Sequence, residues 1–264
     1  MPEARNPSLG DVALALDGLS VASPGAFGTS LKDISLELRE GEVLGSGGGA
    51  GNGQDERLGA LSGELTVGSS AVVFKGEPIG HLGPVARRKR GLLAAPEERL
   101  GHAAAPNMSL SENAALSGWL RQGMVKGKLI DWRKARSFAS EVISAFDVRT
   151  PGTEVPARAL SGGNLQKFVI GREILQAPDV LVGNQPTWGV DASAASRQAL
   201  LDLAAGGAAV LVISQDLDEL MEISTRFAAL NEGRLSAPRP AEGLTVEAIG
   251  LMMGGAHGME VAHV

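Results

Sequence analysis

A glycine-rich stretch near the start of the chain has the spacing of a phosphate-binding loop. It reads "GGGAGNGQDE" over residues 47–56, after a short apolar run and before an expected helix. Backbone N–H groups and a helix start then face an anion. The pattern alone is weak, because a tight turn explains it about as well in a chain with 36 glycines. The predicted phosphate-facing glycines are Gly48, Gly51 and Gly53.

A second stretch is more specific. "LSGGNLQK" covers residues 160–167, and its Ser-Gly-Gly step predicts a helix start with free N–H groups and a hydroxyl. A plain serine N-cap explains the serine but needs neither the two glycines nor the rest of the string. The candidate anion-binding residues here are Ser161, Gly162, Gly163 and Asn164.

Three more strings follow the order and spacing of one known family. Together with the first two they resemble ABC-type ATPases, and most of all the C-terminal half of the tandem ATPases that drive importers of simple sugars and nucleosides. The resemblance covers roughly residues 14–254. The strings that look like the Q-loop, the Walker B strand with its D-loop, and the switch-histidine strand are "APEERLG" (95–101), "PDVLVGNQPTWGVD" (178–191) and "VLVISQDLDEL" (210–220).

The resemblance shows what the glycine loop lacks. Such ATPases place a lysine on the β- and γ-phosphates, but Gln54 stands there and brings no charge. Asp55 and Glu56 replace the two Ser/Thr residues. Carboxylates suit a helix start, yet two unit charges 4 Å apart repel by ~4 kcal/mol at an effective dielectric of 20. A triphosphate is therefore repelled unless Mg²⁺ bridges it to Asp55, which makes Asp55 a weak metal candidate.

The other catalytic positions are also changed. Asn184 stands at the magnesium aspartate, Gln185 at the carboxylate base and Gln215 at the switch histidine. An amide can orient a water but cannot accept its proton. We therefore expect no hydrolysis at this chain's own site, and whether the chain is an enzyme by itself stays open. The four histidines, expected on the surface, lie elsewhere: His81, His102, His257 and His263.

The signature face is intact by comparison. In the family each ATP lies between the phosphate loop of one half and the signature of the other, so residues 161–164 imply a contribution to a partner's site. Asp191 matches the D-loop aspartate that couples the two sites. The implied cofactors are ATP and Mg²⁺ at the partner's site, weak or absent at the chain's own. The implied partners are an ATP-competent half or a homodimer mate, a transmembrane permease and, indirectly, a solute-binding protein.

Three functions follow. The first is an energy-coupling subunit of an ABC importer for a sugar or nucleoside, peripheral at the cytoplasmic face of the membrane. Its permease groove is expected between the loop 96–101 and the helix around 109–119. The second is a non-catalytic module that binds nucleotide and regulates a complex. The third, an autonomous ATPase that uses Asp55 and Gln185 in unusual roles, is the least favoured.

Composition excludes several other classes. A net charge of −6 over 264 residues argues against nucleic acid as a partner. The basic run 87–90 is more simply a solvated helix face than a binding patch. The absence of cysteine excludes disulfides and thiolate chemistry. No apolar run approaches the ~18 residues of a membrane span, and the first ten residues have no apolar centre, which predicts no signal peptide.

The elements that position these residues predict an α/β fold. It is a P-loop NTPase-like ABC ATPase core with a parallel sheet, an N-terminal antiparallel β layer and a helical insertion. The expected division is a core over 8–100 and 160–236, a helical subdomain over 101–159 and a tail over 237–264. Expected strands cover 12–16, 31–38, 43–44, 72–74, 179–182, 208–213, 227–230 and 234–235. Expected helices cover 55–61, a start at 109–112, 134–146, 164–176, 192–204, 217–224 and 246–253.

Some details depart from the family. The family's tandem proteins carry two halves and this chain matches one, so a separate subunit, a gene remnant or an excised piece all fit. The glycines within 45–48 predict a weaker core strand. An adenine-stacking aromatic is not evident. Phe27 is the nearest candidate, although a core phenylalanine explains it better. A Pro/Gly turn is expected at 24–25.

Overall fold

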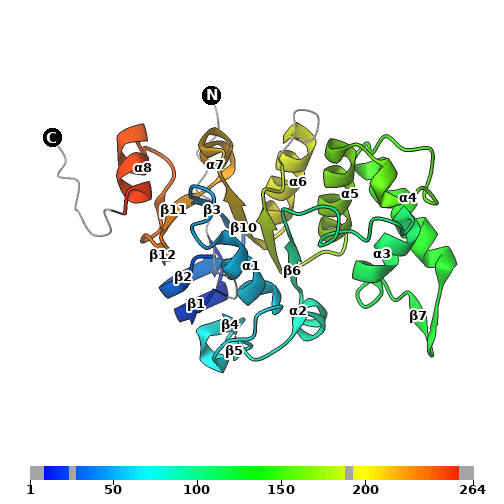
Figure 1. Ribbon diagram of the computed structural model, residues 1–264, viewed down its shortest axis with the longest axis horizontal. Helices are drawn as coiled ribbons and strands as arrows, with labels where there is room; N and C mark the ends of the chain where they lie inside the picture. The colour runs from blue at the N-terminus through cyan, green and yellow to red at the C-terminus, as the bar shows by residue number, and fades with distance from the viewer. Residues whose placement is uncertain (1–8, 24–27, 188–192, 256–264) are drawn as a thin grey trace.

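The structure is a computed structural model that describes residues 9–23, 28–187 and 193–255. It confirms the α/β class: a central sheet lies between an antiparallel layer and a row of helices (Figure 1). The turn expected at 24–25, Phe27, Asp191, His257 and His263 lie outside the described residues. Within the described ranges no helix is both long and apolar enough to span a bilayer.

The main sheet carries the predicted parallel core. Its order is β12-β11-β3-β10-β9-β6, with β13 paired to β11. The β11, β3, β10, β9 and β6 strands run parallel, whereas β12 and β13 are antiparallel to β11. The central strands are continuous apolar runs because helices and a second sheet cover both faces. The strands are β3 Val43–Gly47, β6 Leu92–Ala95, β9 Val180–Asn184, β10 Ala209–Ser214, β11 Arg226–Asn231, β12 Arg234–Leu235 and β13 Arg239–Pro240.

The predicted antiparallel layer forms a separate sheet. Its order is β2-β1-β4-β5. Alternation in the second strand places Ile34, Leu36 and Leu38 inside and the residues between them outside. The layer packs beside α1 and β3, so it helps to hold the glycine loop. The strands are β1 Val12–Val21, β2 Leu31–Arg39, β4 Val72–Phe74 and β5 Glu77–Pro78.

The remaining elements are helices and one small hairpin. The α3 and α4 helices lie at one end of the molecule and pack on α5, which separates them from the main sheet (Figure 1). The β7–β8 hairpin joins α3 to α4. The helices are α1 Gln54–Ser62, α2 Pro84–Arg90, α3 Leu110–Gly118, α4 Trp132–Ala145, α5 Gly162–Ile174, α6 Ser193–Ala205, α7 Leu217–Ile223 and α8 Val246–Met253. The hairpin strands are β7 Val125–Lys126 and β8 Leu129–Ile130.

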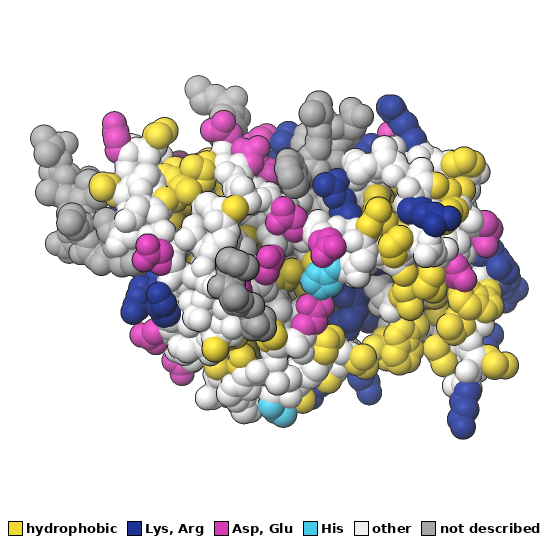
Figure 2. Space-filling model, in the orientation of Figure 1, with side chains coloured by type: hydrophobic (Ala, Val, Ile, Leu, Met, Phe, Trp, Pro, Cys, Tyr) yellow, Lys and Arg dark blue, Asp and Glu magenta, His cyan; other side chains and the backbone are white. Residues whose placement is uncertain are grey.

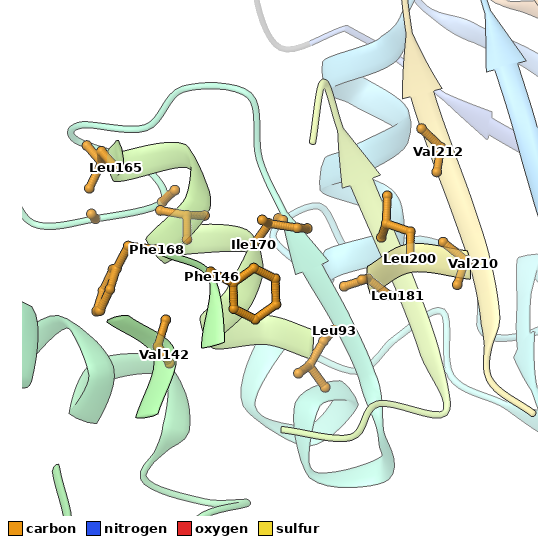
Figure 3. Packing of buried hydrophobic residues seen from close by; sticks show 14 of the residues in the cluster. Leu93, Val142, Phe146, Leu165, Phe168, Ile170, Leu181, Leu200, Val210 and Val212 are labelled. Atoms are coloured by element: carbon orange, nitrogen blue, oxygen red, sulfur yellow. The ribbon is translucent and has the colours of Figure 1, made fainter. Parts of the chain in front are cut away.

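Two apolar clusters form the core, one on each face of the main sheet. Alternate residues of the buried strands supply them, since successive side chains point to opposite faces. On one face Leu181 and Val210 pack against α5 and α6, where Phe168 and Ile170 also meet Phe146 (Figure 3). On the other face the strands pack against α1 and the antiparallel layer. The α1 helix is therefore placed by burial beneath the end of β3.

A buried ionic network ties the helical end to the sheet. Arg172 of α5 donates to the carbonyls of Asn113 and Ala103 and pairs with Glu173 at 3.0 Å. Glu173 also pairs with Arg88 of α2. Burial alone would raise the pKa of Glu173, but the two guanidiniums outweigh it and hold that pKa below its ordinary value. The paired charges thus fix α2, α3 and α5 relative to one another.

Several expectations need correction. The interpretation of 87–90 as a solvated face is wrong for Arg87, which is fully buried and donates to four backbone carbonyls. The expected helix at 134 begins at Trp132, because Asp131 caps it by accepting from the N–H of Lys134. The β7–β8 hairpin and the α2–β6 unit were not predicted. By contrast, the capping box at 109–112 is confirmed, as are His81 and His102 on the surface.

Candidate functional site

The glycine loop lies between β3 and α1, as predicted. Two glycines are sterically required. A Cβ on Gly48 would lie 2.6 Å from the carbonyl oxygen of Leu230, and Gly53 has a φ of 106° and would meet a leucine side chain at 2.8 Å. Gly51 has a φ of 79° with open space around its Cβ position. The first hydrogen bond of α1 runs from the N–H of Arg57 to the carbonyl of Gly53, so the earlier N–H groups of the helix have no partner within it.

Gln54 folds back onto the loop. Its Nε2 donates to the carbonyl of Gly49 at 2.7 Å, and its Oε1 accepts from the N–H of Asn52 at 3.0 Å. The amide therefore uses one loop N–H that an anion would otherwise bind. The side chain stabilises the loop from within, without supplying a charge.

Asn52 fastens the loop to the end of the main sheet. Its Oδ1 accepts from the N–H of Glu232, and its own carbonyl accepts from the N–H of Gly233. Its Nδ2 donates to the carbonyl of Gly49. The loop is thus held in shape by the turn between β11 and β12, and this fixed shape does not require a bound anion.

Asp55 and Asn184 face each other at 3.3 Å between Nδ2 and Oδ1. Asn184 ends β9, and its side chain lies on the sheet face that α1 covers. In the resembling family a hydroxyl and a carboxylate occupy these two positions. Here the carboxylate of Asp55 is on the helix and the neutral amide of Asn184 is on the strand.

Arg57 lies buried beneath the loop. It is fully inaccessible to solvent, and Nη2 donates to Oγ of Ser46 on β3 at 2.8 Å. Nε and Nη1 have no hydrogen-bond partner among the described residues. Burial lowers the pKa of Arg57 to about 10. This cation is buried between α1 and β3, so its charge does not reach the surface of the loop.

Gln185 is buried at the end of β9 in a hydrogen-bonded cluster. Its backbone has a φ of 52°, its N–H donates to the carbonyl of Ile213, and its Oε1 accepts from Oγ of Ser214 at 3.1 Å. Gln166 of α5 donates to its carbonyl. The backbone of Gln185 is therefore held by α5 and β10, and its side-chain oxygen is held by Ser214 of β10.

A carboxyl lies next to this cluster. Glu219 of α7 is 3.5 Å from Oγ of Ser214, and its other oxygen has no partner among the described residues. Burial, followed by the nearby carboxylate of Asp216, raises the pKa of Glu219 to about 7. Reasoning from sequence missed Glu219, Ser214, Gln166 and Arg57. A charged or polar residue inside an otherwise apolar buried segment was the available signal.

The signature residues start α5, as predicted. Ser161 is its N-cap, and Oγ accepts from Nδ2 of Asn164 at 2.9 Å. Ser161 and Gly162 are exposed, while Gly163 and Asn164 are half-buried. Asn164 is fixed in turn because its Oδ1 accepts from the N–H of Arg149. The helix start therefore presents the serine hydroxyl and free N–H groups to solvent.

A cleft of about 880 Å³ lies between α1 and the start of the signature helix α5. Asp55 and Gly162 both line it, and the segment 96–100 lies between them. Glu97 in this segment has a raised pKa, first because it is partly buried and then because the Asp55 carboxylate is near. The cleft is acidic at the end where a phosphate-binding loop would be basic.

The remaining predicted positions are separate from this cleft. Gln215 is exposed just after β10, and Asp191 lies outside the described residues. Within those residues no three acids or histidines come together as a metal site would require. Asp55 supplies one carboxylate, and Mg²⁺ in nucleotide sites takes one or two together with the phosphates. The donor set therefore does not fit a metal site built by the protein alone.

Comparison with known proteins gives one family. The ABC transporter family model matches residues 31–188. The guanosine import ATP-binding protein of Bacillus subtilis is 36% identical over 261 residues, which are 96% of this chain and 50% of that protein. The nucleoside import ATP-binding protein of Lactococcus lactis is 35% identical over 248 residues, 93% of this chain and 49% of that protein. The chain spans about half the length of the curated relatives it matches.

Solved structures agree on the fold. An ATP-binding cassette dimer in a post-hydrolysis state with ADP and Pi matches with a TM-score of 0.72 at 19% identity. The match covers 88% of this chain and all of that one. At this identity the match concerns the fold alone, and it confirms the predicted ABC ATPase core.

Proposed function

The chain belongs to the ABC transporter family of ATP-binding domains. We propose that it is the half of an importer's ATPase pair that does not hydrolyse ATP at its own site. In this role its signature residues complete the ATP site of a second, ATP-competent half. The pair drives a small solute through a membrane permease. The solute is proposed to be a nucleoside or a simple sugar, because the relatives' names include guanosine, nucleoside, glucose and ribose import. The strings "PEERLG" and "PTWGVD" lean towards a nucleoside.

The Asp55–Asn184 contact is the observation that carries this proposal. In this pair a carboxylate stands at the position that the resemblance matches to a hydroxyl, and an amide at the position that it matches to the magnesium carboxylate. Gln185 adds a neutral, buried amide at the position of the base. Gln185 and Gln54, at the positions of the base and of the phosphate-binding lysine, are then both neutral amides.

The exposed start of α5 supports the second part. Ser161 and Gly162 are accessible, and Asn164 is hydrogen-bonded in place. Preorganised N–H donors at a helix start stabilise developing phosphate charge without reorganisation. ATP and Mg²⁺ are accordingly proposed at the partner's site.

A second groove, which shares Pro96 and His102 with the cleft, supports permease docking. Its volume is about 370 Å³, and its walls come from α1, α2, α3 and α5. Arg88 and Glu173 of the buried ionic network line it. A permease loop seated there would contact the residues that fix the helical end to the sheet, so its movement would be transmitted to the signature helix.

A rebuilt copy of the chain provides the test. The rebuilt copy regains the family's residues at its own site and loses its own signature. It is expected to be inactive alone, and the unmodified chain is also expected to be inactive alone. Mixing the two should produce Mg²⁺-dependent ATP hydrolysis, because the unmodified chain supplies the signature. The rebuilt copy carries Gln54→Lys, Asp55→Ser, Asn184→Asp, Gln185→Glu, Gln215→His and Ser161→Glu.

The controls locate the effect. Introducing Ser161→Glu into the otherwise unmodified chain should abolish hydrolysis by the mixture. Thr245→Glu, which changes the exposed N-cap of α8, should leave it intact. A mixture no more active than either copy alone, although both are folded, would rule out the proposed role of the signature.

A nucleotide-binding regulatory module is the second candidate. The observation in its favour is the loop that Gln54 and Asn52 hold in shape, with N–H groups still available at the start of α1. Micromolar ATP binding by the chain, without hydrolysis in the mixture, would favour it.

A further inference from the structure

The β7–β8 hairpin and the helices beside it carry an exposed apolar surface, which we call the hairpin patch. Its side chains are between 36% and 77% exposed, and Leu129 is the most exposed of them. Part of the patch forms a depression of about 280 Å³ with a mostly apolar lining. Two of the chain's three tryptophans belong to it. The patch consists of Leu116, Trp119, Val125, Leu129, Ile130 and Trp132.

The patch lies within a basic segment of an acidic protein. Residues 119–136 contain six lysines and arginines and one acid, whereas the whole chain has a net charge of −6. The one acid, Asp131, caps α4 and lies 3.6 Å from Lys126. The hydrogen bond from the N–H of Lys134 lowers the pKa of Asp131 most, and the charges of Lys126 and Arg133 lower it further. Lys128 and Arg133 are exposed.

Other charged groups around the depression do not cancel this excess. Glu112 lines it, but its carboxylate accepts from the N–H of Ser109 in the capping box of α3. Arg136 and Arg158 lie with Trp132 around a neighbouring polar depression, which Glu154 also lines; the carboxylate of Glu154 accepts from Oγ of Ser111. Figure 2 shows apolar side chains gathered over α3 and the hairpin, with basic side chains at the hairpin's tip and along the outer edge.

The hairpin patch is continuous with the proposed permease groove. Leu116 of α3 lines both depressions. A chain that docks on a permease through the groove therefore holds the patch close to the membrane on the same side. This part of the argument depends on the proposed function.

We propose that the hairpin patch binds the surface of an anionic lipid bilayer. Tryptophans concentrate at the membrane–water interface, where a ring can be partly buried while its N–H stays in water. Lysines and arginines beside an anionic leaflet each contribute about 1 kcal/mol. Leu129, Ile130 and the two tryptophans supply apolar contact, and Lys128 and Arg133 face the headgroups. An exposed apolar patch with a polar rim is typical of such interaction surfaces.

Charge favours lipid over a protein loop as the occupant. Cytoplasmic loops of membrane proteins carry an excess of lysine and arginine, and a basic rim would repel them. Anionic headgroups are attracted to the same rim. The permease therefore occupies the groove in the proposed arrangement, and lipid occupies the hairpin patch.

Co-sedimentation of the full chain with vesicles tests the proposal. One set of vesicles contains phosphatidylcholine alone, and the other contains phosphatidylcholine with about 30% phosphatidylglycerol. Binding is expected to the second set, falling as salt rises because the headgroup charge is screened. Lys128→Glu with Arg133→Glu should weaken binding by at least about 30-fold, which is the loss of two basic contacts. Leu129→Ser should weaken it separately.

Matched variants at the other end of the molecule serve as controls. Lys32→Glu with Arg234→Glu makes the same charge change at two exposed positions, and Val246→Ser removes an exposed apolar side chain. These should reduce binding less than threefold. All variants lie on the surface, and unchanged thermal unfolding would show that they fold.

Several results would overturn the proposal. They are no binding of the unmodified chain to anionic vesicles, equal losses in hairpin and control variants, or equal binding to both vesicle sets. Binding only to vesicles that contain the permease, lost in Leu129→Ser, would assign the patch to the permease instead. The ATPase mixing experiment contains no lipid, so failure here leaves the proposed function untouched, and failure there leaves this result untouched.

Discussion

Asn184 at the end of β9 donates its side-chain amide to the carboxylate of Asp55 at the start of α1, over 3.3 Å. The two residues are 129 positions apart in the chain, and the packing of α1 on the sheet brings them together. Asp55 gains both this hydrogen bond and the helix start, which stabilise its negative charge. The same negative charge repels a phosphate group that approaches the loop.

We expect the effect of Asn184→Asp on stability to depend on whether Asp55 is still present. Asn184→Asp alone should destabilise the fold by about 1–3 kcal/mol, because two carboxylates then face each other and repel. Adding Asp55→Ser should recover most of that loss. Urea unfolding of the two single variants and the double variant measures the coupling. Additive effects of the two changes would show that the side chains do not interact.

We expect replacement by leucine to have opposite effects on stability at Arg57 and at Arg87. Both are fully buried, but Arg57 has two nitrogens without partners among the described residues, whereas Arg87 donates to four carbonyls. Arg57→Leu should stabilise the protein by about 1–4 kcal/mol, as replacement of a poorly paired buried charge often does.

Arg87→Leu is the matched comparison. It should destabilise by about 3 kcal/mol or more, because several buried carbonyls lose their donor. The midpoints of urea unfolding decide both cases. A loss of stability in Arg57→Leu comparable to that in Arg87→Leu would contradict the assignment of Arg57 as an unpaired buried cation.

Glu219 predicts a dependence of stability on pH. Its pKa is raised from an ordinary value near 4.5 to about 7 by burial and by Asp216. Between about pH 4.5 and pH 7 the native state therefore keeps a proton on Glu219 that the unfolded state has already released. The stability linked to this proton is fully present below about 4.5 and is lost as the pH rises through about 7.

Glu219→Gln keeps the shape and removes the titration. The difference in unfolding free energy between the variant and the unmodified chain should therefore grow in the variant's favour from pH 5 to pH 8. Glu222→Gln, an exposed change on the same helix, should not reproduce this. A constant difference across the range would mean that Glu219 titrates normally.

ATP titration calorimetry, with and without Mg²⁺, tests the charge of the loop. Gln54→Lys with Asp55→Ser should bind ATP at least tenfold more tightly than the unmodified chain, because a cation is added and a repelling carboxylate is removed. Gln198→Lys with Asp11→Ser makes the same charge change at exposed positions away from the loop and should have little effect. Equal affinities for the loop variant and the unmodified chain would show that loop charge does not limit binding.

Local sequence was sufficient for much of the fold. The short apolar runs that became β9 and β10 are strands because both faces of a parallel sheet are covered. The capping box at Ser109 and the N-cap at Ser161 depend on residues within three positions, so their spacing predicts them directly. The prediction that Gln54, Asp55 and Gln185 replace the family's usual residues also came from the order of the family's motifs.

The sequence by itself therefore determined the family and the order of most elements, but not the α2–β6 unit or the β7–β8 hairpin. Only the tertiary structure decided which residues of the site meet. It placed Asn184 against Asp55, buried Arg57 without a full set of acceptors, and set Ser214 between Gln185 and Glu219. It also formed a β-hairpin with exposed apolar side chains over residues 125–130, within a region that was expected to be helical. Burial and hydrogen bonding between distant segments depend on how helices and sheets pack, and neighbours in sequence do not specify that packing.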